Sequence, residues 1–173
     1  MTRSVLAYLC RYNFKREFGL NKVFGELTFD VGWHVKKPVN IELWGKSYPI
    51  KVTAESYYEE DSITKEQEEA YASFTENKAV KQQRVEALLL EYYKENPLEN
   101  LYHQESLEYC DVNIAEFKIN IKQQLPNVLT PRILVIDDEG TCALLFDDKI
   151  DPDNGIAVIL SPTEEVMTQD EYL

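Results

Sequence analysis

The chain has 173 residues, enough for one domain with a substantial core, and its 44% apolar content excludes an intrinsically disordered protein. The formal net charge is −13, and residues 1–22 hold five basic side chains against one acid, a local +4, so residues 23–173 carry −17. A negative charge of this size argues against nucleic-acid binding and favours a cationic partner.

The cysteines and the N-terminal sequence indicate the cellular compartment of the protein. Cys10, Cys110 and Cys142 are far apart and show no CxxC spacing, which argues against a disulfide framework or a zinc site. The apolar run after Arg3 is too short for a signal peptide, and no stretch has membrane-spanning length. We therefore expect a cytoplasmic protein with no membrane partner.

Residues 1–22 form a basic N-terminal arm or short element, and a strand, a frayed helix and an arm remain open for it. Alternating apolar and polar residues then predict strands at 24–30, 39–44 and 48–52, separated by turns at 30–33 and 45–47. Three strands with such short links predict an antiparallel meander. Pro49 has no backbone N–H, so it indicates a sheet edge or a bulge.

The composition becomes helical after residue 59. Thr64 and Gln67 have the spacing of a capping box, and the helix that they begin is interrupted near Asn77. A second helix with a wider apolar face ends at Asn96-Pro97. Residues 114–125 fit a strand or a helix, and the length of the pattern favours a helix ended by Pro126.

Strands return after Pro131. We predict strands at 133–136, 141–146 and 156–160, joined by turns at 137–140 and 151–155. Strands, then helices, then strands indicate an α+β fold, with antiparallel sheets from the N- and C-terminal strands and the central helical segment packed on one face. We expect residues 23–173 to form this single domain.

The C-terminal strands carry a dense rim of acids, since residues 133–173 contain eleven acidic side chains and one lysine. Acids also occupy the first turn of the helix that Thr64 begins. Trp44 points away from the face of Leu43, so it is an interface anchor unless the helices cover it. The tyrosine pairs Tyr57-Tyr58 and Tyr92-Tyr93 suit either core or interface. The predicted partner-binding residues are Trp44, Glu66, Glu68, Glu69, Asp137, Asp138, Glu139, Asp147, Asp148, Asp151 and Asp153.

No catalytic or metal motif accompanies these acids. His34 and His103 stand outside any nucleophile motif, and the turn before Gly155 fails the EF-hand pattern because Ile150 and Pro152 fall on ligand positions. The dispersed glycines supply no phosphate loop. We predict a non-enzymatic protein without cofactor or metal. The alternatives are a metal-dependent hydrolase that uses the Asp147–Asp153 turn with His34 or His103, and a structural protein with no special partner.

Several short motifs resemble an uncharacterised family of small acidic bacterial proteins found in toxin–immunity neighbourhoods, including those of contact-dependent growth inhibition. They are Phe24-Gly25-Glu26-Leu27 with Gly32-Trp33, Ile41-Glu42-Leu43-Trp44-Gly45-Lys46, Ile63-Thr64 with Gln67 and Ala70-Tyr71, and Leu144-Leu145-Phe146-Asp147 with Gly155-Ile156-Ala157-Val158. Relatives usually have an acid and a histidine before that last glycine, where this chain has Asp153 and Asn154. The resemblance implies an immunity protein that neutralises a cognate toxin domain, and the acids predict a basic, nuclease-type toxin.

Overall fold

The computed structural model describes residues 18–97, 119–149 and 151–173. The predicted helix at 114–125 and His103 therefore lie partly or wholly outside the described residues. The described elements follow one another as β1 (Phe18–Asn21), β2 (Gly25–Phe29), β3 (Trp33–Val35), β4 (Val39–Leu43), β5 (Lys46–Ala54), α1 (Lys65–Glu76), α2 (Lys78–Glu95), the 3-10 helix η2 (Lys122–Asn127), β6 (Leu129–Ile136), β7 (Cys142–Asp148), β8 (Ile156–Ser161), β9 (Glu165–Thr168) and α5 (Gln169–Tyr172).

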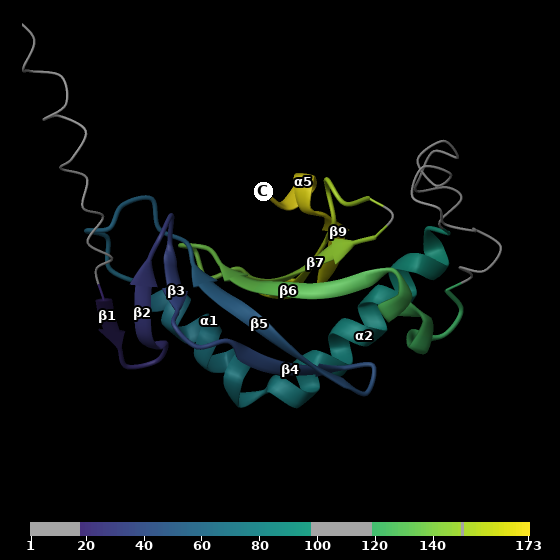
Figure 1. The fold of residues 1–173 in the computed structure, drawn as a ribbon, viewed down its shortest axis with the longest axis horizontal. Coiled ribbons are helices and arrows are strands. Elements are labelled where there is room, and N and C mark those ends of the chain that lie inside the picture. Colours follow the sequence, from purple (N-terminus) through teal and green to yellow (C-terminus); the bar gives the residue numbers. More distant parts are fainter. Residues whose placement is uncertain (1–17, 98–118, 150) are drawn as a thin grey trace, which may run out of the picture.

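The strands form one curved sheet in the order β1-β2-β3-β5-β6-β7-β8-β9, and β4 pairs with β5 off this path (Figure 1). The predicted α+β class is confirmed, with N- and C-terminal strands in the same sheet. The prediction of purely antiparallel pairing is wrong at one place: β5 and β6 run parallel, with Lys51 opposite Ile133. A parallel pair needs a long crossover, which the helical segment between the two strands supplies.

The first strands do not form the predicted simple meander. The short strand β3 lies between β2 and the end of β5, where Trp33 faces Ala54, and β4 pairs with the beginning of β5. Pro49 faces Asn40 of β4, and it precedes Lys51, where the pairing with β6 begins. The missing N–H of Pro49 therefore falls on a stretch that pairs with β4 alone, which agrees with the predicted edge position.

Both helices begin and end where the sequence predicts. The side chain of Thr64 accepts a hydrogen bond from the backbone of Gln67, whose own side chain accepts one from the backbone of Thr64, and Asn77 ends α1. Helix α2 ends before Asn96 and Pro97. Near the third predicted helix, the described chain forms only the 3-10 helix η2, with Pro126 inside it.

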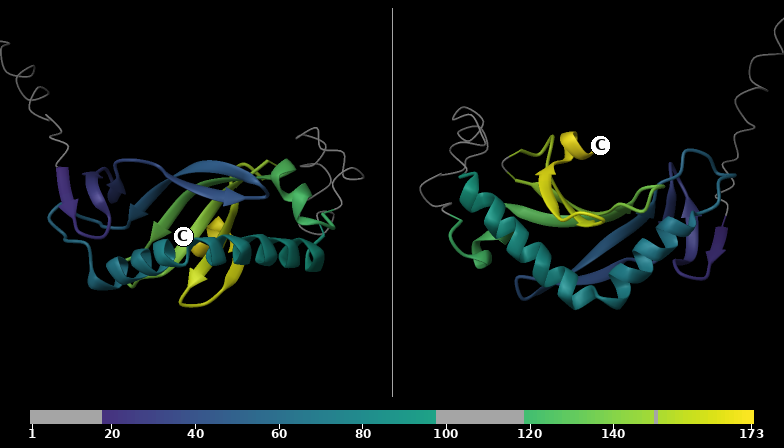
Figure 2. Two further views of the ribbon diagram at one scale, coloured as in Figure 1. Left: turned by 90° about the horizontal axis from the view of Figure 1, so that it is seen from below. Right: turned by 180° about the vertical axis from the view of Figure 1, so that it is seen from behind.

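Helices α1 and α2 cover one face of the sheet, and α5 lies on the other (Figures 1 and 2). The helix-covered face holds the larger core, in which Phe24 stacks on Tyr71 with ring centroids 4.4 Å apart. The opposite face has a smaller apolar cluster, against which Tyr172 of α5 packs; its buried members are Val135, Ala143, Leu145, Ala157 and Ile159. Strand β7 contributes to both faces, which explains its unbroken apolar run.

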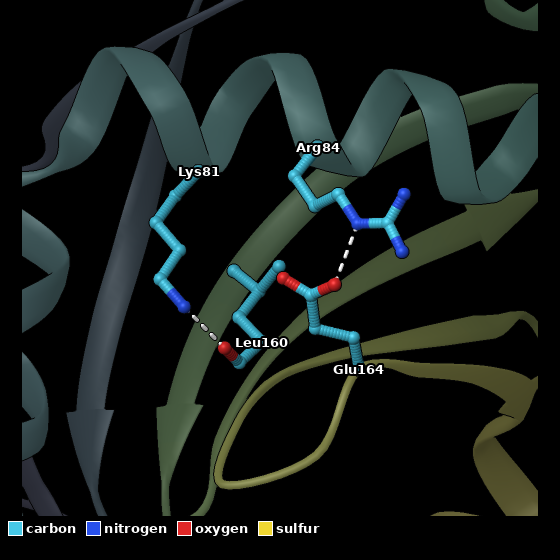
Figure 3. A network of polar contacts seen from close by, with 4 residues as sticks. All are labelled: Lys81, Arg84, Leu160 and Glu164. Atoms are coloured by element: carbon cyan, nitrogen blue, oxygen red, sulfur yellow. Dashed lines mark hydrogen bonds and ion pairs between the residues drawn. The ribbon is translucent and has the colours of Figure 1, made fainter.

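Polar side chains of α2 fix the helix to the sheet. Lys81 donates to the carbonyl oxygen of Leu160 at the end of β8, and Arg84 Nε lies 2.5 Å from Glu164 Oε2 beyond that strand (Figure 3). Further along the helix, the buried Glu86 accepts from the backbone N–H of Trp44 and from Lys122 Nζ at 2.7 Å. One carboxylate thus joins α2, the β4–β5 turn and η2.

Candidate functional site

The acids predicted in the two turns lie at opposite ends of strand β7. The β6–β7 turn precedes strand β7 and the β7–β8 turn follows it (Figure 1). A strand of seven residues spans about 20 Å, so the two acidic turns are separated by roughly that distance. The two turns are therefore two separate surfaces. The surface at the β6–β7 turn also includes the beginning of α1.

The β6–β7 turn packs directly against the beginning of α1. Thr64 Oγ1 donates to the carbonyl oxygen of Asp138 at 3.1 Å. Gly140 has a φ of 89°, and a Cβ built on it would lie 2.9 Å from the carbonyl oxygen of Glu66, so the close approach requires glycine. Asp137 Oδ1 accepts from the backbone N–H groups of Glu139 and Thr141 at 3.1 and 2.7 Å, which fixes the turn. The side chains of Asp138, Glu139 and Glu66 remain exposed.

A cavity of about 300 Å³ lies between this turn and the loop from β5 to α1. We call it the acidic cavity; its lining residues are Glu55, Ser56, Tyr57, Asp61, Ser62, Thr64, Gln67 and Asp138. Three of these residues are acids and, within the described chain, none of the lining residues is basic. Burial raises the pKa of the Glu55 carboxyl, and the negative charges of Asp137 and Asp138 raise this pKa further. The cavity therefore holds carboxylates whose charge is not balanced by a lining cation.

Gln67 connects the three segments that surround the acidic cavity. Its side chain is buried, and Nε2 donates to the carbonyl oxygens of Glu55 at 2.8 Å and Ile136 at 3.2 Å. Its Oε1 accepts from the backbone N–H of Thr64 at 3.0 Å. Gln67, the second member of the capping box of α1, therefore also fixes the ends of β5 and β6. Sequence reasoning found the cap, but it did not find the cavity.

The other helix acids have partners within the chain. Glu68 is half-buried and accepts from Asn21 Nδ2 at 2.7 Å, which joins α1 to the end of β1. Glu69 lies 2.8 Å from Lys65 Nζ, one turn away on the same helix. Of the three predicted helix acids, Glu66 is therefore the one that the structure places beside the β6–β7 turn.

The acids at the opposite end are mostly engaged in contacts of the fold. Asp147 lies 2.6 Å from Arg132 Nη1, and Asp151 accepts from Asn154 Nδ2 at 2.9 Å. Asp148 was predicted to contact a partner, but it is 2% exposed and lies 3.5 Å from the Tyr93 hydroxyl, so it belongs to the interior. Asp153 is exposed. The sequence analysis placed Asp148 in the turn after Phe146, whereas Asp148 is the last residue of β7 and shares the buried face of Phe146, with Asp147 exposed between them.

Trp44 is not the outward strand residue that alternation predicts. It occupies the β4–β5 turn with a φ of 53°, so the two-residue period of the strand no longer sets its direction. Its ring is half-buried, with its centroid 6.1 Å from that of Phe146 and 5.9 Å from that of Tyr48. The alternative in which Trp44 is covered therefore describes the structure better.

His34, one of the two histidines considered for catalysis, has a structural role, and the thiol of Cys142 is buried. His34 Nε2 lies 2.6 Å from the carbonyl oxygen of Asp30 and Nδ1 lies 2.7 Å from Thr53 Oγ1, so both ring nitrogens bridge β3 to its neighbours. Burial raises the pKa of the Cys142 thiol to about 12, even though Lys81 lowers it, so this thiol is protonated at neutral pH. Among residues 18–97, 119–149 and 151–173, no group of three or more potential ligands could hold a metal ion.

The two tyrosine pairs differ in burial: one packs in the core and the other is exposed. Tyr93 is buried and Tyr92 is half-buried against it, whereas Tyr57 and Tyr58 are 88% and 67% exposed. Tyr57 lines the acidic cavity. An exposed aromatic pair next to unbalanced carboxylates is the feature that the sequence-based site prediction missed, although the pair itself is visible in the sequence.

The family described as "Domain of unknown function (DUF6985)" matches residues 23–173. The chain belongs to this family. Strand β1 precedes the DUF6985 match and pairs with β2 inside it, from Phe18 opposite Thr28 to Asn21 opposite Gly25. No match was found among curated proteins or among solved structures. None of the helices in the described part of this DUF6985 chain is long and apolar enough to span a bilayer.

Proposed function

We propose that this protein is a non-enzymatic, cytoplasmic binding protein whose partner is a cationic protein domain. The observation that carries the proposal is the acidic cavity, in which Glu55, Asp61 and Asp138 line a space with no basic lining residue in the described chain. Exposed acids of α1 and of the β6–β7 turn extend the same negative surface. Such a field speeds the approach of a cationic protein and repels nucleic acid.

The specific form of the proposal is an immunity protein that neutralises a cognate toxin domain. A nuclease toxin carries a cationic cleft because it binds phosphates, so a compact acidic surface can block that cleft. The family resemblance described above supports a toxin as the partner. The structural roles of His34 and Cys142 favour binding over catalysis.

The test is co-expression with the product of the gene directly upstream, which the proposal expects to carry a toxin domain, followed by affinity capture and stopped-flow association. We expect a stable complex and an on-rate that falls about tenfold or more between 50 and 500 mM salt. Failure to capture the toxin domain would contradict the immunity role. An on-rate that does not change with ionic strength would contradict the acidic steering.

A pair of charge-matched variants locates the effect. Asp61→Asn with Asp138→Asn removes two exposed charges at the acidic cavity, and Asp153→Asn with Glu165→Gln removes two exposed charges elsewhere. We expect the cavity variant to slow association more, because charges near the contact surface steer most strongly. Equal slowing by both variants would mean that only the net charge matters.

A further inference from the structure

We infer that the contact centre of this surface is apolar and aromatic: Val31, Tyr57 and Tyr58 touch the partner directly, and the surrounding acids steer it into place. The inference rests on the proposed function and deepens it, since it identifies the contact residues and the chemistry of the segment that binds them. We call these three residues the aromatic patch.

The side chains of the aromatic patch are large and hydrophobic, yet they are largely exposed to solvent. Val31, Tyr57 and Tyr58 are 90%, 88% and 67% exposed, so none of them contributes much to the core. Val31 also has a φ of 52°, in the left-handed region that a β-branched residue rarely adopts. A valine at such a position is strained and exposed, so folding gains little from it, and strained residues of this kind concentrate at binding sites.

The two connections that carry the patch lie together at one end of the sheet (Figures 1 and 2). A Cβ built on Gly32 would lie 3.2 Å from Thr53 Cγ2 and 3.3 Å from the carbonyl oxygen of Ala54, so the turn that carries Val31 rests against the end of β5. The loop that carries the tyrosines starts at that same strand end. Both connections are thus anchored to one rigid element.

The tyrosine loop is held in place before any partner binds. Trp33 Nε1 donates to the carbonyl oxygen of Asp61 at 2.9 Å. Ser56 Oγ and the backbone N–H of Asp61 both donate to the carbonyl oxygen of Tyr58, at 2.8 and 3.1 Å. A surface that is already ordered loses little conformational entropy on binding, so contacts made by its aromatic side chains contribute strongly to affinity.

Acids surround the patch and determine its partner. Asp30 precedes Val31, Glu59 and Glu60 follow the tyrosines, and Asp138 lines the adjoining cavity. Charge complementarity therefore selects a cationic segment that also offers aliphatic side chains. Arginine or lysine can lie over the tyrosine rings by cation–π contact while an aliphatic neighbour covers Val31. A second copy of this chain would bring the same acids against each other, which disfavours self-association.

Defined peptides test this chemistry on the full-length chain. The probes are two blocked hexapeptides, one that alternates arginine with leucine and one of arginine alone, titrated at 50 and 300 mM salt by calorimetry and amide NMR. We expect the alternating peptide to bind more tightly at 300 mM salt and to shift the resonances of the aromatic patch. Tyr57→Ser with Tyr58→Ser should weaken its binding about tenfold, as for a buried aromatic contact.

Two further variants separate contact from folding. Val80→Ser removes an apolar side chain that is 67% exposed on α2, away from the patch, and should leave affinity unchanged. Val31→Gly should raise thermal stability, because glycine adopts the left-handed conformation freely, and should still weaken peptide binding. A residue with a merely structural role would not give both effects.

The outcomes distinguish the inference from the proposed function. If both peptides bind equally and the tyrosine variant has wild-type affinity, the surface is purely electrostatic and the inference is wrong, whereas the proposed function stands. Absence of peptide binding, or shifts away from the patch, also overturns the inference, and toxin capture then decides the proposed function separately. Sedimentation that shows a dimer abolished by the tyrosine variant would identify a second copy as the occupant and refute the cationic partner.

Discussion

Replacing Gln67 by methionine tests whether this one side chain holds together the end of the molecule that carries the acidic cavity. Methionine has a similar length and good helix propensity, but it removes three hydrogen bonds: one from the backbone N–H of Thr64 and two to the carbonyl oxygens of Glu55 and Ile136. A buried hydrogen bond contributes about 1 kcal/mol, and a buried carbonyl left without a donor costs about 1–3 kcal/mol. The Ile136 oxygen keeps a second donor in the backbone N–H of Glu55, so the cost arises mainly at Glu55 and Thr64.

We therefore expect Gln67→Met to lower the free energy of unfolding by about 2–4 kcal/mol, part of the loss being offset by the more apolar side chain. In a chain of 173 residues this corresponds to a fall in Tm of roughly 5–15 °C. Urea denaturation measures the change, and Gln83→Met, at an exposed position of α2, is the control, with an expected change within about 0.5 kcal/mol. If Gln67→Met is as stable as the control, the side chain does not connect α1 to the strand ends.

Three further predictions concern the same fold. Gly140→Ala should destabilise more than Gly45→Ala in thermal denaturation, because both have positive φ but only the first Cβ would meet a backbone oxygen; equal losses would show that crowding is unimportant. The raised pKa of Glu55 means that its carboxyl group binds a proton more tightly in the folded protein than in the unfolded chain. Ionisation of Glu55 therefore lowers the free energy of unfolding, fully so above the folded pKa. This loss vanishes as pH falls below the ordinary pKa range of glutamate. Glu55→Gln should thus stabilise the protein at pH 7 in urea titrations and lose this advantage near pH 4; a gain independent of pH would refute the assigned cause. Arg84→Met should cost at most about 1 kcal/mol because its ion pair is solvent-accessible, whereas Lys81→Met should cost more because it leaves the Leu160 carbonyl near the end of β8 without its lysine donor; the reverse order in urea titrations would contradict this account.

Local patterns in the sequence were sufficient for the elements with strong periodicity. In β4, Ile41 and Leu43 are fully buried while Asn40 and Glu42 are exposed, as alternation predicts. The capping box at Thr64 and the turn at 137–140 also lie where predicted, because both depend on short-range hydrogen bonds. Strands β1, β3 and β9 were not assigned; each has only three or four residues, too few for a period to show.

Local sequence patterns could not predict which distant segments pair with each other. The parallel contact of β5 with β6 joins Lys51 to Ile133, and the sequence between them offers no signal that chooses parallel over antiparallel pairing. The same limit explains the site prediction. Asp137 and Glu66 were both named, yet only the folded chain brings their segments together, and it places the Asp147–Asp153 turn at the opposite end.

The separation of the two acidic ends changes what the negative charge can do. At the β7–β8 end, Arg132 offsets the charge of Asp147, and Asn154 fixes the Asp151 carboxylate by a hydrogen bond, so this end has less net field available to a partner. At the acidic cavity, burial raises the pKa of Glu55 most, repulsion from Asp137 and Asp138 raises it further, and no lining cation in the described chain offsets this repulsion. A cation from a partner would relieve that repulsion on binding. Only the part of the lost stability that comes from this repulsion is available as affinity, and it favours the cavity end over the β7–β8 end as the binding surface.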